Sequence, residues 1–66
     1  MQIKVNGEAR EFSAPMNVLA LAELLKLNPK QVAIERNREI VPRSLYGDVA
    51  LGDGDEIEIV QFIGGG

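Results

Sequence analysis

The sequence of 66 residues predicts an α+β fold, in which a small mixed β-sheet carries one helix packed across it. Three observations lead to this prediction. Stretches of alternating apolar and polar residues, typical of half-buried strands, occur near both ends of the chain. A leucine-rich segment with helical spacing lies between them. Turn signals rich in Asn, Gly and Asp separate these stretches from one another.

The first twelve residues, MQIKVNGEAREF, predict a β-hairpin. Ile3 and Val5 alternate with polar residues, and Asn6-Gly7 supplies the positive φ angles of a type I′ turn. The expected pairs are Val5 with Glu8, Ile3 with Arg10 and Met1 with Phe12. This register places Phe12 on the core face and leaves the aliphatic stem of Arg10 along the sheet edge.

The segment NVLALAELLKLNP, residues 17–29, predicts the helix. Asn17 can accept hydrogen bonds from the free amides of the first turn. An apolar stripe follows at helical spacing, and we expect it to be the core face rather than a partner-binding face. The stripe consists of Val18, Leu21, Ala22 and Leu25, with Leu24 widening it. Asn28-Pro29 should end the helix, because the residue before a proline is pushed out of the helical region.

Three more strands are expected, in QVAIERN (31–37), EIVP (39–42) and DEIEIVQF (55–62). Asn37-Arg38 is a plausible reversal between the first two, and Pro42 marks a short or edge strand because it cannot donate to a ladder. The signal Gly52-Asp53-Gly54-Asp55 introduces the last strand. In that strand Ile57 and Ile59 point to one face, whereas Glu58 and Val60 point to the other.

The order is therefore strand, strand, helix, strand, short strand, strand. The helix can make the crossover that parallel pairing of the first and last strands requires, which places these two strands at the centre of the sheet. This arrangement is the ubiquitin-like β-grasp fold. We expect one β-grasp domain over residues 1–63 and a flexible C-terminal glycine tail over residues 64–66.

Composition limits the functions that the chain can have. It contains no Cys and no His, and therefore lacks the commonest general base, the commonest metal ligand and any thiol. Seven basic and ten acidic residues give a net charge of −3, which disfavours nucleic acid as a partner. No apolar run reaches the roughly 20 residues that span a bilayer, and no signal-peptide core follows Met1. We expect a cytoplasmic protein that is not an enzyme and binds no cofactor.

The glycines that end the sequence, Gly64, Gly65 and Gly66, raise the question of function. Terminal glycines can be a cloning scar or a frayed end. Three extended residues, however, reach about 10 Å beyond the sheet and fit a channel that any Cβ would block. The carboxylate of Gly66 could then attack the α-phosphate of ATP to form an acyl-adenylate, which a sulfur or nitrogen nucleophile can open.

The whole chain resembles the ThiS family of sulfur carriers within the ubiquitin-like β-grasp group. The resemblance rests on MQIKVNG at the start, VAIERNREIVPRS in the middle and LGDGDEIEIVQFIGGG at the end. It implies that a ThiF-type activating enzyme uses ATP to adenylate Gly66, and that sulfur from a cysteine desulfurase converts it to a thiocarboxylate. A ThiG-type thiazole synthase would then take the sulfur into the thiazole ring of thiamin. Family members commonly end in Gly-Gly, so Gly64 lengthens the tail by one residue.

The sequence also allows other interpretations. A sulfur carrier for molybdopterin synthesis and a protein modifier joined to lysines through Gly66 would use the same tail, and a plain interaction module would leave it inert. Val60 and Phe62 form either a partner-binding patch or part of the core rim. Glu35-Arg36-Asn37 is interpreted as a strand end and turn in preference to a partner contact. Pro42-Arg43-Ser44 is interpreted as an irregular turn, and Ser44-Leu45 is not taken as a phosphopantetheine site.

Overall fold

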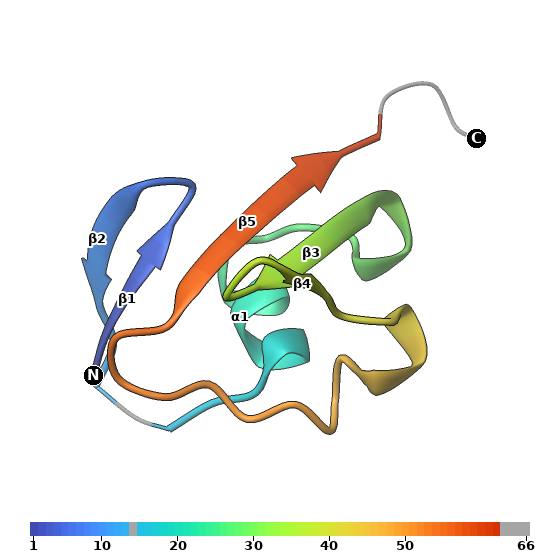
Figure 1. Ribbon diagram of the computed structural model, residues 1–66. Helices are drawn as coiled ribbons and strands as arrows, with labels where there is room; N and C mark the ends of the chain where they lie inside the picture. The colour runs from blue at the N-terminus through green and yellow to red at the C-terminus, as the bar shows by residue number, and fades with distance from the viewer. Residues whose placement is uncertain (14, 63–66) are drawn as a thin grey trace.

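The computed structural model describes residues 1–13 and 15–62, which form a five-stranded sheet with the order β2-β1-β5-β3-β4. The strands are β1 (Gln2–Val5), β2 (Glu8–Glu11), β3 (Val32–Arg36), β4 (Glu39–Ile40) and β5 (Glu56–Gln61). One helix, α1 (Val18–Leu24), lies across one face of this sheet, and two short 3-10 helices, η1 (Pro29–Gln31) and η2 (Arg43–Leu45), flank β3 and β4 (Figure 1). The β-grasp fold predicted from the sequence is confirmed.

The β1–β2 hairpin has the predicted register, with Val5 opposite Glu8 and Ile3 opposite Arg10. Asn6 and Gly7 adopt φ angles of 50° and 82°, as a type I′ turn requires. The N–H of Phe12 donates to the carbonyl of Met1, so the pairing continues one step beyond the strands. Phe12 is buried and Arg10 is exposed, which agrees with the placement expected for both side chains.

β5 is the central strand. It pairs in parallel with β1 and antiparallel with β3, and the connection from β1 to β5 includes α1, as the crossover argument predicts. In Figure 1, β5 crosses the middle of the sheet, with β1 and β2 on one side and β3 and β4 on the other. Of its inward side chains, Ile57 is fully buried and Ile59 is half-buried against the core. The strand therefore has one apolar face that packs on the core and a second face that is exposed to solvent.

The helix begins where the sequence predicts, because the Asn17 side chain accepts a hydrogen bond of 2.7 Å from the N–H of Ala20. It ends at Leu24, earlier than Asn28-Pro29, so the predicted helix end is wrong. Lys26 adopts a φ of 61°, and the N–H of Leu27 donates to the carbonyl of Ala22. This is a Schellman ending, in which a left-handed residue closes the helix. Asn28-Pro29 instead starts η1.

The predicted apolar stripe of the helix is correct in its centre and wrong at one edge. Val18, Leu21 and Ala22 are fully buried, whereas Leu24 is 56% exposed. Successive helical residues are rotated by about 100°, so Leu24 lies roughly 110° from the centre of the buried stripe. A helix of two turns buries only a narrow face against the sheet, and Leu24 lies outside this face.

The core lies between α1 and the sheet. Its buried apolar residues are Ile3, Val5, Phe12, Val18, Leu21, Ala22, Val32, Ile34, Val41, Tyr46, Leu51 and Ile57. Tyr46 follows η2, the irregular turn expected around Pro42-Arg43-Ser44, and its buried hydroxyl donates to the Val32 carbonyl over 3.1 Å. This bond satisfies a polar group inside the core and joins the turn to β3.

Candidate functional site

The site proposed from the sequence lies at the carboxyl end of β5, and hydrogen bonds hold this strand on both edges. On the β1 side, the N–H of Lys4 donates to the carbonyl of Asp55 and that of Asn6 to the carbonyl of Ile57. On the β3 side, the register runs from Arg36 opposite Ile57 to Val32 opposite Gln61. Pairing continues to Phe62, whose N–H donates to the Gln31 carbonyl over 2.8 Å. The sheet thus supports the chain until two residues before the glycines.

The three glycines of the predicted tail, Gly64, Gly65 and Gly66, lie outside the described residues, as does Ile63. The predicted boundary between domain and tail therefore stays a prediction. The structure does show the part of the chain from which the tail departs, namely the last residues of a central strand.

Val60 and Phe62 are exposed, by 60% and 51% of their surfaces. Val60 points away from the face that buries Ile57, so neither its burial nor its orientation places it in the core. Both side chains are therefore exposed, and their role as a partner-binding patch stays a prediction.

Two other residues extend this apolar surface. Ala33 on β3 lies directly opposite Val60, and Ile40 on β4 lies opposite Glu35, diagonal to Ala33. Ile40 is 64% exposed. We call Ala33, Ile40, Val60 and Phe62 the outer patch. Ala33 and Ile40 were not predicted to belong to this surface, because they join Val60 only through strand pairing across the sheet.

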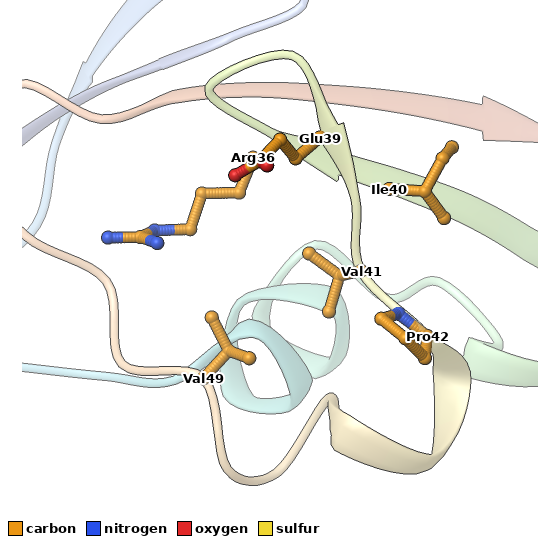
Figure 2. Close-up of a pocket in the computed structure, with 6 residues that line it drawn as sticks. All are labelled: Arg36, Glu39, Ile40, Val41, Pro42 and Val49. Atoms are coloured by element: carbon orange, nitrogen blue, oxygen red, sulfur yellow. The ribbon is translucent and has the colours of Figure 1, made fainter.

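Figure 2 shows how β4 divides its side chains between the two faces. Val41 points toward Val49 in the interior, whereas Ile40 points to the other side of the strand. These residues line a pocket at the sheet edge together with Arg36, Glu39 and Pro42. The pocket shares Ile40 with the outer patch, but Arg36 pairs with Ile57 near the beginning of β5, so the pocket does not extend to the carboxyl end of the strand. We therefore do not place the functional site in the pocket.

Glutamates border the outer patch. Glu35 and Glu58 face each other directly on β3 and β5, and Glu56 lies one step away on the same face. Like charges at directly opposed positions destabilise a sheet. Among the described residues, none of the ion pairs includes Glu35 or Glu58. Apart from Lys4, which lies opposite Glu56 on β1, the charged side chains named on this surface are acidic.

Arg36 and Asn37, from the motif Glu35-Arg36-Asn37, have a structural role. Their side chains donate hydrogen bonds of 2.9 Å and 3.1 Å to the carboxylate of Asp55, which is buried at the turn before β5. The N–H of Gly52 donates to the same carboxylate over 2.8 Å. The interpretation of this motif as a strand end and turn therefore agrees with the structure. Asp55 itself was expected only as part of a turn signal.

The electrostatics of Asp55 follow from these contacts. Burial raises the pKa of its carboxyl group, but the hydrogen bonds from Gly52, Asn37 and Arg36, together with the charge of Arg36, lower it more. The pKa of Asp55 therefore lies below its ordinary value. Asp55 is ionised at neutral pH and fixes the start of β5.

The described residues contain no cluster of three or more His, Cys, Asp or Glu side chains that could hold a metal ion. Within the same residues, α1 is too short to cross a bilayer, and no other helix is long enough. What the described part of the chain does present at the end of β5 is an apolar, acid-bordered surface beside a supported backbone. This arrangement is suited to docking rather than to acid–base chemistry.

Fold and site together define a class of protein, the ubiquitin-like β-grasp domains whose central strand leads into a glycine-rich end. Comparison with known proteins identifies the family within this class. The model of the ThiS family matches residues 3–66. The chain belongs to the ThiS family, as the sequence analysis predicted.

Individual relatives support this assignment. The sulfur carrier protein ThiS of Bacillus subtilis is 51% identical over 65 residues, which cover 97% of this chain and 98% of that protein. A crystal structure of the thiamine biosynthesis protein ThiS from Geobacter metallireducens matches with a TM-score of 0.86 and 32% identity, over the full length of both chains.

A third relative is larger. The thiazole synthase of Paramagnetospirillum magneticum is 56% identical over 66 residues, which are all of this chain but only 20% of that protein. The chain thus spans about a fifth of the length of this relative. A ThiS-like segment and the remainder of a thiazole synthase occur there in one polypeptide.

Proposed function

We propose that this domain is a sulfur carrier for thiazole formation in thiamin biosynthesis, and that Gly66 bears the sulfur. One observation carries the proposal: in a ThiS family chain, the central strand β5 is held on both edges, and its pairing on the β3 side continues to Phe62, two residues before the glycines. The name of the Bacillus subtilis relative, which this domain matches over nearly its whole length, supports the role of sulfur carrier.

The proposed chemistry takes place on the carboxylate of Gly66 in the active site of a ThiF-type activating enzyme. A carboxylate oxygen attacks the α-phosphorus of ATP and expels pyrophosphate, which leaves an acyl-adenylate. The terminal sulfur of a persulfide, supplied by a cysteine desulfurase, attacks the acyl carbon and displaces AMP. A second thiol then attacks the resulting acyl disulfide, forms a disulfide and releases the thiocarboxylate.

The domain acts in this scheme as a co-substrate and supplies no catalytic acid or base. The sequence, which contains neither His nor Cys, is consistent with such a role. ATP is consumed by the activating enzyme and is not a bound cofactor of the carrier. Because the reaction needs ATP, the proposal places the protein in the cytoplasm.

Two partners follow from the proposal. The outer patch would dock on the activating enzyme. Its apolar side chains are exposed and lie outside the core, so they can be buried against a partner while the core stays intact. The bordering glutamates would then face basic groups. Thiazole synthase is proposed as the acceptor of the sulfur, and the larger relative, named a thiazole synthase, supports this choice.

The test is reconstitution of the thiocarboxylate. Intact mass first establishes that Gly66 carries a free carboxylate in the purified protein. The protein is then incubated with activating enzyme, ATP, cysteine and desulfurase, treated with an alkylating reagent and digested. We expect alkylation of the C-terminal peptide, and none when ATP is omitted.

Alkylation is needed because intact mass alone is ambiguous. Replacement of oxygen by sulfur adds the same nominal mass as oxidation of a methionine, and the chain contains Met1 and Met16. A sulfoxide is not alkylated under these conditions, whereas a thiocarboxylate is nucleophilic. A C-terminal peptide that stays unalkylated with a verified partner enzyme would overturn the proposal. Isopeptide conjugates through Gly66 in cells would instead favour a protein modifier.

A further inference from the structure

Asn6 makes an unusual set of contacts with β5. Its backbone N–H donates to the Ile57 carbonyl over 2.8 Å. Its side chain reaches further along the strand, where Oδ1 accepts a hydrogen bond of 2.7 Å from the N–H of Ile59 and Nδ2 donates to the Ile59 carbonyl over 3.3 Å. The side-chain amide thus takes the place that the next residue of a longer β1 would occupy beside β5.

This contact lies where β5 loses its neighbour. The chain turns away from β5 at Gly7, so β1 itself offers no further backbone group to Ile59. On the β1 side, the Asn6 side chain makes the last hydrogen bonds to β5 in the described part of the chain. Beyond it, only pairing with β3 and the bond from Phe62 to Gln31 hold the strand.

The direction of β5 at Ile59 matters for the proposed reaction. Ile59 is seven residues before Gly66, and seven extended residues span at most about 25 Å. A change of about 10° in strand direction at Ile59 would displace the end of such an extended segment by about 4 Å. A partner channel that accepts the glycines would have to correct this displacement on binding.

We infer that Asn6 is a positioning residue, which fixes the direction in which β5 presents the tail to the activating enzyme. This inference rests on the proposed function. The turn by itself does not require the side chain to contact β5, because glycine also tolerates a φ of 50° and would make neither hydrogen bond to Ile59.

The molecule contains a matched control. Asn37 occupies the first position of the β3–β4 turn, also with a φ of 50°, and its side chain also bonds to β5. Its Oδ1 accepts from the N–H of Glu56, at the opposite end of the strand. Asn6→Gly and Asn37→Gly each keep a turn residue that tolerates positive φ and remove a side-chain amide from β5.

The experiment measures amide hydrogen exchange by NMR and the kinetics of adenylation by pyrophosphate release. In Asn6→Gly we expect the Ile59 amide to exchange about tenfold faster, because it loses its hydrogen-bond acceptor. The KM of the activating enzyme for this variant should rise about threefold to tenfold, with kcat within about twofold of the wild-type value. The reason is that the end of β5, freed from Asn6, must be ordered on binding. Asn6→Asp keeps the acceptor, so it should restore protection of the Ile59 amide and reverse part of the rise in KM.

Asn37→Gly should lower the melting temperature and leave both Ile59 exchange and KM unchanged. The inference is overturned if Asn6→Gly leaves Ile59 exchange unchanged, or if its KM equals that of Asn37→Gly. Failure of the proposed function has a different signature, because wild-type protein would then release no pyrophosphate with the activating enzyme. In that case the exchange data still decide whether Asn6 holds the end of β5.

Discussion

Asp55 shows how a single residue organises the start of the central strand. Its carboxylate accepts three hydrogen bonds, from Gly52, Arg36 and Asn37, and its backbone carbonyl accepts one from the N–H of Lys4. It therefore connects the turn before β5 with β3 on one side and β1 on the other. Among the described residues, Asp55 is the charged side chain that is buried, and its contacts lower its pKa.

We predict that Asp55→Asn destabilises the fold by about 2 kcal/mol at neutral pH. The asparagine amide carries no charge, and its NH2 group would face one of the three N–H groups that donate to the carboxylate. The free energy of unfolding in urea, measured at pH 7, provides the test. Asp48→Asn is the control, since its side chain is exposed and takes part in none of the described hydrogen bonds. Equal stability of both variants would contradict the structural role of Asp55.

Asp55 also predicts a pH dependence. Because its pKa in the folded protein lies below the unfolded value of about 3.9, its stabilising contribution is fully present above that value. The contribution is lost as the pH falls through the lower folded pKa. Wild-type stability should therefore decline below about pH 4 more steeply than that of Asp55→Asn. Parallel unfolding curves for both proteins in acid would contradict this expectation.

At the scale of elements, β5 combines two roles on its two faces. Its inward side chains, Ile57 and Ile59, pack on the core, whereas Val60 belongs to the outer patch. Strand alternation separates these roles, so a change on the outer face need not disturb the core. The short edge strand β4 adds Ile40 to the same surface.

We predict that Val60→Asp folds normally and binds the activating enzyme at least about tenfold more weakly, because a charge would be buried at the centre of an interface. Circular dichroism and calorimetric titration measure the two effects. Ala9→Asp is the control, since Ala9 lies opposite Lys4 on the same sheet face but on β2. If Val60→Asp fails to fold, or if both variants bind equally weakly, the outer patch is not the docking surface.

At the largest scale, the described folded body is distinct from the group that is proposed to react. The described core and sheet involve residues up to Phe62, whereas the proposed chemistry occurs at Gly66. Stability and activity should therefore respond to different substitutions.

Deletion of Gly65-Gly66 should leave the melting temperature almost unchanged and abolish ATP-dependent activation, because residues beyond a sheet contribute little to stability. Gly54→Ala should do the reverse. Gly54 has a φ of 88°, so an alanine there costs about 1–2 kcal/mol, while the end of the chain stays intact. Thermal unfolding and pyrophosphate release distinguish the two variants. Normal adenylation of the shortened protein would refute the role of Gly66.

Much of this architecture could be predicted from the sequence because it depends on short-range preferences. Asn6-Gly7 and Asn37-Arg38 determine tight turns, and these turns set the register of the strands beside them. Asn17 determines where the helix begins. Alternation along β5 correctly predicted that Ile57 and Val60 lie on opposite faces of the strand. The order of elements correctly predicted the parallel pairing of β1 with β5.

Contacts between side chains of different elements could not be predicted from the sequence. Leu24 has the same hydrophobicity as the buried Leu21, and its exposure depends on the small area that one short helix covers. Ile40 joins Val60 in the outer patch through β3, and the Asn6 amide reaches Ile59 across 53 positions of sequence. Local preference specifies turns and strand faces, but contacts between distant residues depend on how the finished elements pack, which no single segment encodes.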